Sequence, residues 1–179
     1  MGRLTENTVL NMKNKSYSIT AEVLVPPDGA TGVIIAQGGA FAGWSLYLNG
    51  GLPTYCYNLL GLNRVKVAGT DPVPAGTHQV RVEFAYDGGG LAKGGNLSLY
   101  VDGNQVATGR LEATVPMIYS GDETCDIGAD SASPVSDDYG PTNNRFTGTV
   151  NWVQLDAGAD DHDHLITPEE RFRVAMARQ

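Results

Sequence analysis

The stretch from Gly32 to Asn58, GVIIAQGGAFAGWSLYLNGGLPTYCYN, constrains the fold of this chain more than any other segment. Near its middle, apolar side chains alternate with polar ones: Trp44, Leu46 and Leu48 against Ser45, Tyr47 and Asn49. An alternation of period two places successive side chains on opposite faces of a β-strand. Glycine pairs at positions 38–39 and 50–51 flank this strand. They predict a turn at each end, so the segment predicts short strands joined by tight turns.

The composition favours the same kind of structure over the whole chain. The chain has 179 residues, enough for one domain with a hydrophobic core. It contains 23 glycines, and 41% of its residues are hydrophobic. Many glycine turns between short strands would account for both figures. The sequence shows no internal repeat and no linker that would divide this domain.

Three further segments show the strand pattern. From Ser16 to Val25 the odd-numbered residues share one apolar face, and Pro26–Gly29 ends the strand because proline cannot donate to a sheet ladder. From His78 to Tyr86 the alternation is clearest. The run from Phe146 to Leu155 predicts the last long strand, and its expected inward side chains are Phe146, Val150 and Trp152.

The turn and loop signals lie between these strands. Asp102-Gly103 follows an apolar alternation and predicts a hairpin with a type I′ turn, which needs positive φ at both central residues. A short strand is expected near Cys125–Ile127, followed by a polar loop over residues 129–144. The two cysteines, Cys56 and Cys125, could form one disulfide, but two buried thiols are the favoured interpretation.

The last part of the chain differs in kind from the strands. Residues 157–164 are polar and acidic, and residues 168–178 contain good helix formers. Thr167 suits an N-cap, Pro168 suits the first helical position, and Glu170 completes a Thr-x-x-Glu capping box. We therefore expect a lead-in over residues 1–15, a sandwich over residues 16–156, and an acidic loop with a short helix over residues 157–179.

Taken in order, three segments carry a resemblance to a known family: Gly32–Asn58, Asn96–Gly109 and Asn144–Asp156. They resemble a laminin-G-like, concanavalin-A-type jelly roll. More narrowly, residues 3–179 resemble the C-terminal accessory domain of bacterial arylsulfatases. The resemblance implies an all-β sandwich of two antiparallel sheets with a short C-terminal helix. It also implies a non-catalytic role, in which the domain packs on a sulfatase catalytic domain in cis or in trans and stabilises or shapes it.

The sequence does not predict an enzyme. Sulfatases make a formylglycine from the Cys or Ser of a C/S-x-P-S-R motif, and neither cysteine is followed by the required Pro and Arg. The jelly roll also hosts glucanases, whose two carboxylates share a strand about 5–5.5 Å apart in retaining enzymes. Glu83 and Asp87 are four positions apart, but Asp87 falls in a glycine-rich turn. Isolated surface carboxylates are the favoured interpretation.

The acidic segment is the candidate metal site. Residues 159–170 can be aligned with a 12-residue EF-hand loop, which would bind Ca²⁺ through these residues: Asp161, Asp163, Leu165 (by its carbonyl), Thr167 and Glu170. The alignment departs at Ala159, where Asp is expected, and at His164, where Gly is expected. The alternative is a solvated acidic loop before a capped helix, which explains Thr167 and Glu170 equally well. Adventitious binding of Zn²⁺ or Ni²⁺ by His162 and His164 is a weaker alternative.

A carbohydrate-binding, lectin-like module is the alternative function. Lectin-like sites combine aromatic faces with Asn, Asp and Gly on loops, and the expected platform consists of Tyr47, Tyr55 and Tyr57 on an exposed sheet. Both tryptophans, Trp44 and Trp152, are expected to pack in the core instead. A third possibility is self-association through a face that a missing partner would leave bare.

Charge and targeting signals bear on the remaining partners. The formal net charge is −8, with 12 basic residues scattered along the chain, so neither nucleic acid nor a membrane is an expected partner. The first ten residues lack the apolar core of a signal peptide. The compartment therefore stays open between a bacterial cytoplasm and a periplasm.

Overall fold

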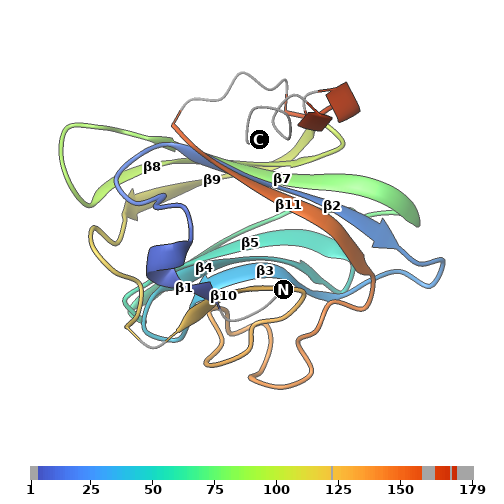
Figure 1. Ribbon diagram of the computed structural model, residues 1–179, viewed down its shortest axis with the longest axis horizontal. Coiled ribbons are helices and arrows are strands. Elements are labelled where there is room, and N and C mark those ends of the chain that lie inside the picture. The colour runs from blue at the N-terminus through green and yellow to red at the C-terminus, as the bar shows by residue number, and fades with distance from the viewer. Residues whose placement is uncertain (1–3, 122, 159–163, 170, 173–179) are drawn as a thin grey trace.

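The computed structural model describes residues 4–121, 123–158, 164–169 and 171–172. These residues form two antiparallel sheets packed face to face (Figure 1). The six-stranded sheet has the order β1 (Leu4–Thr5), β10 (Thr124–Ile127), β3 (Gly32–Gly38), β4 (Gly43–Asn49), β5 (Leu52–Leu59) and β6 (Asn63–Ala68). The five-stranded sheet has the order β11 (Thr149–Ala157), β2 (Tyr17–Val25), β7 (Gly76–Tyr86), β8 (Lys93–Val101) and β9 (Asn104–Ala113). The all-β sandwich predicted from the sequence is confirmed.

The two ends of the described chain add small elements. The predicted lead-in contains β1, which pairs with β10 at the edge of the six-stranded sheet, and a 3-10 helix, η1 (Glu6–Thr8). Near the C-terminus, residues 168–169 and 171–172 are helical, and the Arg171 N–H donates to the Thr167 carbonyl at 3.1 Å. This bond is the first turn expected of a helix whose N-cap is Thr167.

The core lies between the sheets and follows the predicted alternation. Trp44, Leu46 and Leu48 of β4 are buried in it, and so are the odd-numbered residues of β2 from Tyr17 to Val25. The indole Nε1 of Trp44 donates to Gln37 Oε1 at 3.1 Å, which satisfies the donor inside the core. Asp102 and Gly103 have φ angles of 49° and 77° between β8 and β9, as the predicted type I′ turn requires.

A β-bulge in β11 overturns one expectation. Val150 pairs with Val23, but Trp152 pairs with Glu22, so Asn151 is an extra residue between two successive pairs. The extra residue shifts the alternation by one position. Val150 and Val153 face the core, whereas Trp152 faces away from it, opposite the outward Glu22. The prediction that Trp152 points inward is therefore wrong, because a period-two pattern in the sequence does not reveal a bulge.

Both cysteines are buried free thiols, as favoured from the sequence. Burial raises the pKa of Cys56 to about 11 and that of Cys125 to about 12. Cys56 lies in the six-stranded sheet on the face opposite the main core. Both thiols are thus held in their protonated, unreactive form at neutral pH.

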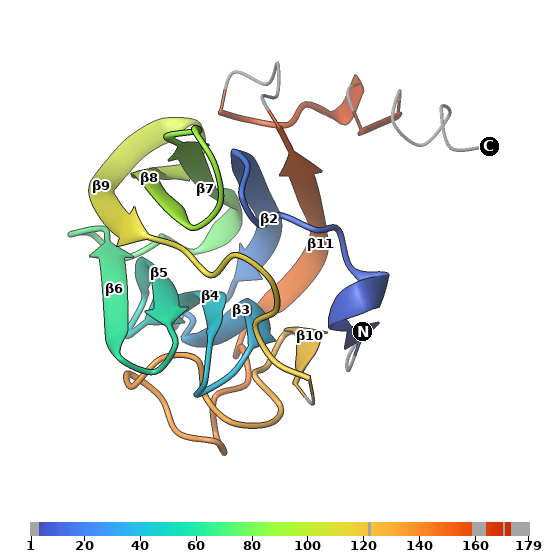
Figure 2. The same cartoon turned by 90° about the vertical axis from the view of Figure 1, so that its left-hand side faces the viewer.

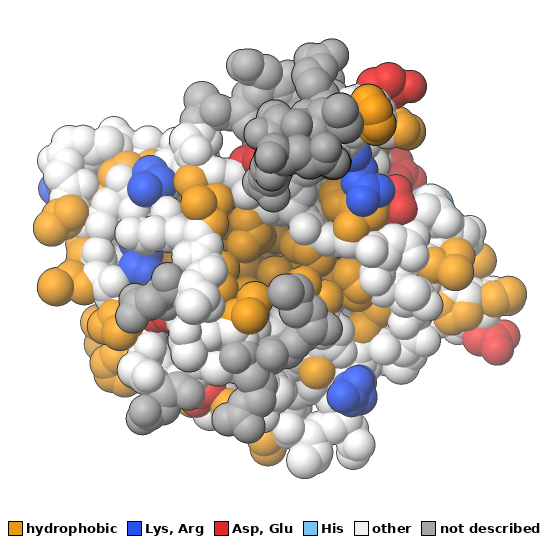
Figure 3. All heavy atoms as spheres, viewed as in Figure 1, with side chains coloured by type: hydrophobic (Ala, Val, Ile, Leu, Met, Phe, Trp, Pro, Cys, Tyr) orange, Lys and Arg blue, Asp and Glu red, His pale blue; other side chains and the backbone are white. Residues whose placement is uncertain are grey.

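The edge of the sandwich formed by β11 and β10 is only partly closed. Val150, Val153 and Leu155 of β11 and Ile127 of β10 pack against the core but stay partly exposed. Figure 3 shows hydrophobic side chains gathered in the opening between the two sheets on this side. Among the described residues, no helix is long and apolar enough to cross a bilayer.

Candidate ligand site

The segment between β10 and β11 forms an extra layer on the six-stranded sheet. Figures 1 and 2 both show it on the side of that sheet that faces away from the five-stranded sheet. The sequence predicts a polar loop here, but Val135 is fully buried. Val135 and Tyr139 pack on a second small cluster of outward side chains of the sheet: Val33, Ala36, Tyr47 and Cys56. The apolar outer face of β3, β4 and β5 is therefore covered by this segment, which we call the β10–β11 loop (residues 128–148).

Two buried polar residues fix the shape of the loop. The Asn144 side chain donates to the carbonyls of Asp130 and Gly140 at 2.7 and 2.9 Å, and it accepts the Asp130 N–H at 3.1 Å. Asp130 Oδ2 accepts the Val135 N–H at 2.9 Å and the Tyr139 hydroxyl at 2.8 Å. Burial raises the pKa of Asp130 to about 6. The backbone of a buried loop cannot bond to water, and these hydrogen bonds satisfy its polar groups instead.

A polar hollow of about 290 Å³ opens between this loop and the ends of β3 and β4. The Tyr47 hydroxyl donates to Asp138 Oδ2 at 2.6 Å, and Asn49 Nδ2 donates to the same oxygen at 3.3 Å. The other carboxylate oxygen of Asp138 pairs with Lys66. Exposed Thr142 and Asn143 complete the rim. The hollow is thus lined by a carboxylate, amides and hydroxyls within one small space.

A second hollow, of about 560 Å³, lies on the other side of the same part of the loop. Residues 142–144 line both hollows. The second one adds Ser131 and the exposed Arg145, which supplies a cationic guanidinium. Together the two hollows contain groups that can donate and accept hydrogen bonds. We call them the loop hollows.

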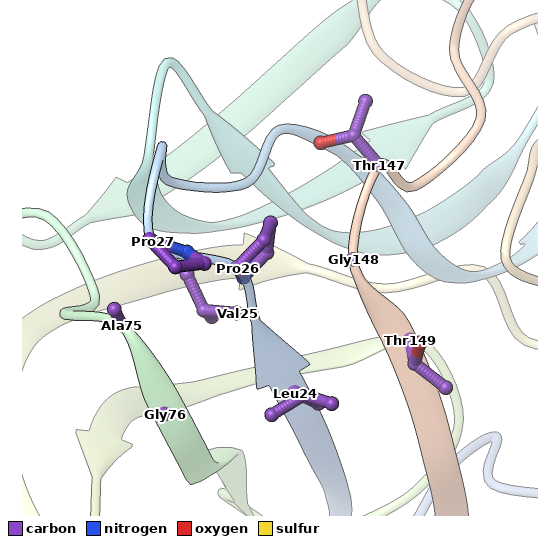
Figure 4. Close-up of a pocket in the computed structure, with 9 residues that line it drawn as sticks. All are labelled: Leu24, Val25, Pro26, Pro27, Ala75, Gly76, Thr147, Gly148 and Thr149. Atoms are coloured by element: carbon purple, nitrogen blue, oxygen red, sulfur yellow. The ribbon is translucent and has the colours of Figure 1, made fainter.

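An apolar groove of about 520 Å³ lies beside them at the same end of the sandwich. Figure 4 shows it between the end of β2, the start of β7 and the start of β11. Its lining is mainly aliphatic and proline, including Leu24, Pro26 and Pro27. Gly148 is required here, since a Cβ atom at this position would lie 2.5 Å from the Leu24 carbonyl oxygen. The groove offers few polar groups, so it suits an apolar group better than a sugar.

The structure contradicts the predicted tyrosine platform. Tyr55 and Tyr57 pair with Leu46 and Trp44 of β4 and share their inward face, so both rings lie in the core. Tyr47 does face outward, but the β10–β11 loop covers it, and its ring meets that of Tyr139 edge-on at 5.2 Å. All three are at most 2% exposed. Rings buried in this way cannot form an exposed surface for a sugar.

The predicted calcium ligands are only partly placed. Asp161, Asp163 and Glu170 lie outside the described residues. Leu165 is exposed and Thr167 is half-buried. His164, at the position where an EF-hand loop has glycine, has a φ of 62°, the left-handed conformation that glycine adopts most easily. Calcium binding stays a prediction.

Apart from Tyr47, the residues of the loop hollows were not singled out from the sequence. A signal was present in the run Ser136–Asn144, SDDYGPTNN, which combines turn formers with one aromatic residue. Their partners on β4 are about 90 positions away in the chain, so only the fold brings Asp138 beside Tyr47 and Asn49.

Several solved structures share this arrangement of strands. Domains LG4-5 of the mouse laminin alpha1 chain align over 87% of this chain and 38% of theirs, with a TM-score of 0.53 and 14% identity. Botulinum neurotoxin type C, whose cell entry depends on interaction with two ganglioside molecules, aligns over 97% of this chain and 39% of its own, with a TM-score of 0.59 and 14% identity. The fold is a laminin G-like jelly roll. The chain spans about two fifths of the length of these two structures.

A third similar structure has nearly the size of this chain. The CBM40 of the Ruminococcus gnavus IT-sialidase, bound to alpha2,3 sialyllactose, aligns over 91% of this jelly roll and 84% of its own chain, with a TM-score of 0.54 and 13% identity. No protein-family model matches the sequence, and no curated protein matches it. Nothing in these comparisons connects the jelly roll to an arylsulfatase.

Proposed function

We propose that this jelly roll is a non-catalytic carbohydrate-binding module and that the loop hollows are its binding site. The observation that carries the proposal is the grouping of Asp138, Asn49, Thr142 and Asn143 around one small space. Sugar hydroxyls both donate and accept hydrogen bonds, and these side chains offer both kinds of group. The CBM40 lends support, because it is a domain of similar fold and nearly the same size that is bound to alpha2,3 sialyllactose.

The geometry also favours a rigid site. Asn144 and Asp130 hold the loop from within by buried hydrogen bonds, and Val135 anchors it on the sheet. A site that is already in its binding conformation loses less conformational entropy when a ligand binds. The role expected from the arylsulfatase resemblance receives no comparable support from the structure and stays a prediction.

The test is calorimetric titration of the domain with a panel of neutral and sialylated oligosaccharides. The variant for the test is the double substitution Asn49→Ala with Thr142→Ala, which removes two polar groups from the rim. We expect a loss of affinity of roughly five- to hundredfold, since two lost hydrogen bonds contribute about 1–3 kcal/mol together. Asn104→Ala, at the start of β9 and outside the hollows, is the matched control and should bind normally. No binding by the unmodified domain across the panel, or equal binding by the double variant, would overturn the proposal.

A further inference from the structure

The chain crosses the outer face of the five-stranded sheet near its C-terminus. We call the described residues of this segment, 164–169 and 171–172, the C-terminal strap. Figures 1 and 2 both show it on the side of the five-stranded sheet that faces away from the six-stranded sheet. Its contacts run from β8 over β7 to the edge strand β11. The strap therefore spans most of the sheet by way of three separate contact points.

The first contact point holds the His164 side chain. Its ring stacks on Tyr100 of β8, with centroids 4.4 Å apart and planes 6° from parallel. Its Nδ1 lies 2.6 Å from Glu83 Oε1 on β7, and this oxygen also accepts from Arg81 Nε at 2.7 Å. Arg81 is fully buried on this outer face. The sheet therefore offers a flat aromatic surface and a positioned carboxylate to a planar ring that carries an N–H.

The second contact point recognises the backbone of Ile166. Gln79 Oε1 accepts the Ile166 N–H at 2.9 Å, and Gln79 Nε2 donates to the Ile166 carbonyl at 2.8 Å. One side-chain amide thus satisfies both polar groups of one residue, as a neighbouring strand would. The Ile166 side chain is 1% exposed. The amide of Gln79 recognises the backbone of one residue, and the buried aliphatic side chain of that residue adds selectivity.

The third contact point lies on the outward Trp152 that the bulge of β11 creates. The Arg171 guanidinium sits 4.5 Å from the centre of the indole ring. The Trp152 Nε1 is buried, and it has no hydrogen-bond acceptor among the described residues. A buried donor without an acceptor is costly. A segment that placed a carbonyl or carboxylate near Nε1 would add a hydrogen bond at this contact point.

We propose that the outer face of the five-stranded sheet is a recognition site for a short peptide segment, which the C-terminal strap with its final helical turn fills in cis. The partner is a segment of another chain with the chemistry of the strap. It carries a planar ring that donates an N–H, an aliphatic residue two positions later, and an arginine five positions after that. The strap is weakly bound to the sheet, because Ile166 is its one deeply buried side chain among the described residues and Phe172 is 68% exposed. A competing peptide can therefore displace it.

The test uses the full chain and a fluorescently labelled peptide with the sequence of residues 162–173. In the variant His164→Ala with Ile166→Asp, the strap should detach and leave the face open. We expect the peptide to bind this variant at least tenfold more tightly than it binds the unmodified chain. Adding Gln79→Leu should abolish this binding, whereas Asn63→Leu, at the exposed start of β6 in the other sheet, should not change it. A folded strap variant that does not bind the peptide, or that binds it equally after Gln79→Leu, would overturn the proposal.

A second measurement covers the case in which the strap variant does not fold. Hydrogen exchange of the unmodified chain compares the Ile166 amide with the paired amides of β7. We expect the Ile166 amide to exchange at least a hundredfold faster, because the strap opens without unfolding the sheet. Exchange at the same rate as β7 would mean that the strap opens only when the whole domain unfolds, which contradicts a displaceable strap.

Discussion

The phenolic oxygens of Tyr17 and Tyr55 lie 2.7 Å apart in the core and form a hydrogen bond from one sheet to the other. Tyr17 belongs to β2 of the five-stranded sheet, and Tyr55 belongs to β5 of the six-stranded sheet. Burial raises the pKa of both phenols above the ordinary value, so both stay protonated. The two sheets are thus joined by a directional contact as well as by apolar packing.

This bond predicts a measurable coupling between the two residues. Tyr17→Phe and Tyr55→Phe should each lower the free energy of unfolding by about 1–3 kcal/mol, because each leaves a buried hydroxyl without its partner. The double variant should lose clearly less than the sum of the two losses. Urea unfolding of the four proteins measures the coupling. Strictly additive losses would show that the hydroxyls do not stabilise each other.

The raised pKa of Asp130 predicts that the free energy of unfolding depends on pH. Its pKa is about 6 in the folded chain against 3.8 ordinarily, so between these values the folded chain binds more protons than the unfolded chain. The stabilisation is present at low pH and is lost as the pH rises through about 6. Asp130→Asn lacks this titration. Its free energy of unfolding should therefore rise relative to that of the unmodified chain by roughly 1–3 kcal/mol between pH 4 and pH 7.

The control for this effect is Asp28→Asn, which changes an exposed carboxylate in the turn after β2. Urea unfolding at several pH values measures all three proteins. A difference between Asp130→Asn and the unmodified chain that does not change with pH would contradict the prediction.

The bulge in β11 predicts that one deletion is tolerated and a nearby one is not. Deleting Asn151 leaves Val150, Trp152 and Val153 opposite the same residues of β2 in an unbroken alternation. The expected loss is about 0.5–1.5 kcal/mol, for the Asn151–Glu22 hydrogen bond. Deleting Gln154 instead shifts the strand by one residue, so either Leu155 or the residues before it turn to the opposite face of the sheet. This change should cost at least about 1.5–3 kcal/mol. Thermal unfolding of both variants checks the order of these losses.

Calcium binding by the acidic loop is a prediction that one substitution can test. After treatment with a chelator, added Ca²⁺ should raise the melting temperature, because a ligand of the folded state stabilises it by mass action. Glu170→Gln should abolish this rise, and the neighbouring Glu169→Gln should not. If Glu170 is only a helix cap, its substitution should cost about 0.5–2 kcal/mol whether or not calcium is present. Calorimetry with Ca²⁺ separates these two results.

Much of the fold follows from local sequence patterns. The alternations of β2, β4 and β7, the stop at Pro26 and the turn at Asp102-Gly103 each depend on residues close in the chain. The outward position of Trp152 does not, because the bulge that causes it is defined by pairing with β2. The alternation of side chains can be recognised from residues that are neighbours in the sequence. The register between two paired strands cannot be recognised in this way.

The candidate site was largely beyond prediction for the same reason. Tyr55 and Tyr57 were expected on an exposed sheet, where their rings could contact a sugar. Their pairing with Leu46 and Trp44 places them in the core instead. Tyr47 has the outward facing that was expected, but a segment about 90 residues later covers it. Burial of these rings depends on long-range contacts, which residue type and spacing do not reveal.

The β10–β11 loop separates the residues that hold it from the residues that face solvent. Asp130, Val135 and Asn144 are buried against the sheet, whereas Thr142 and Asn143 point to the exterior between them. Substitutions at the exposed positions need not disturb the anchors. Related chains can therefore diverge in what they recognise while the same scaffold persists, which makes this loop the part of the molecule best suited to rapid evolutionary change.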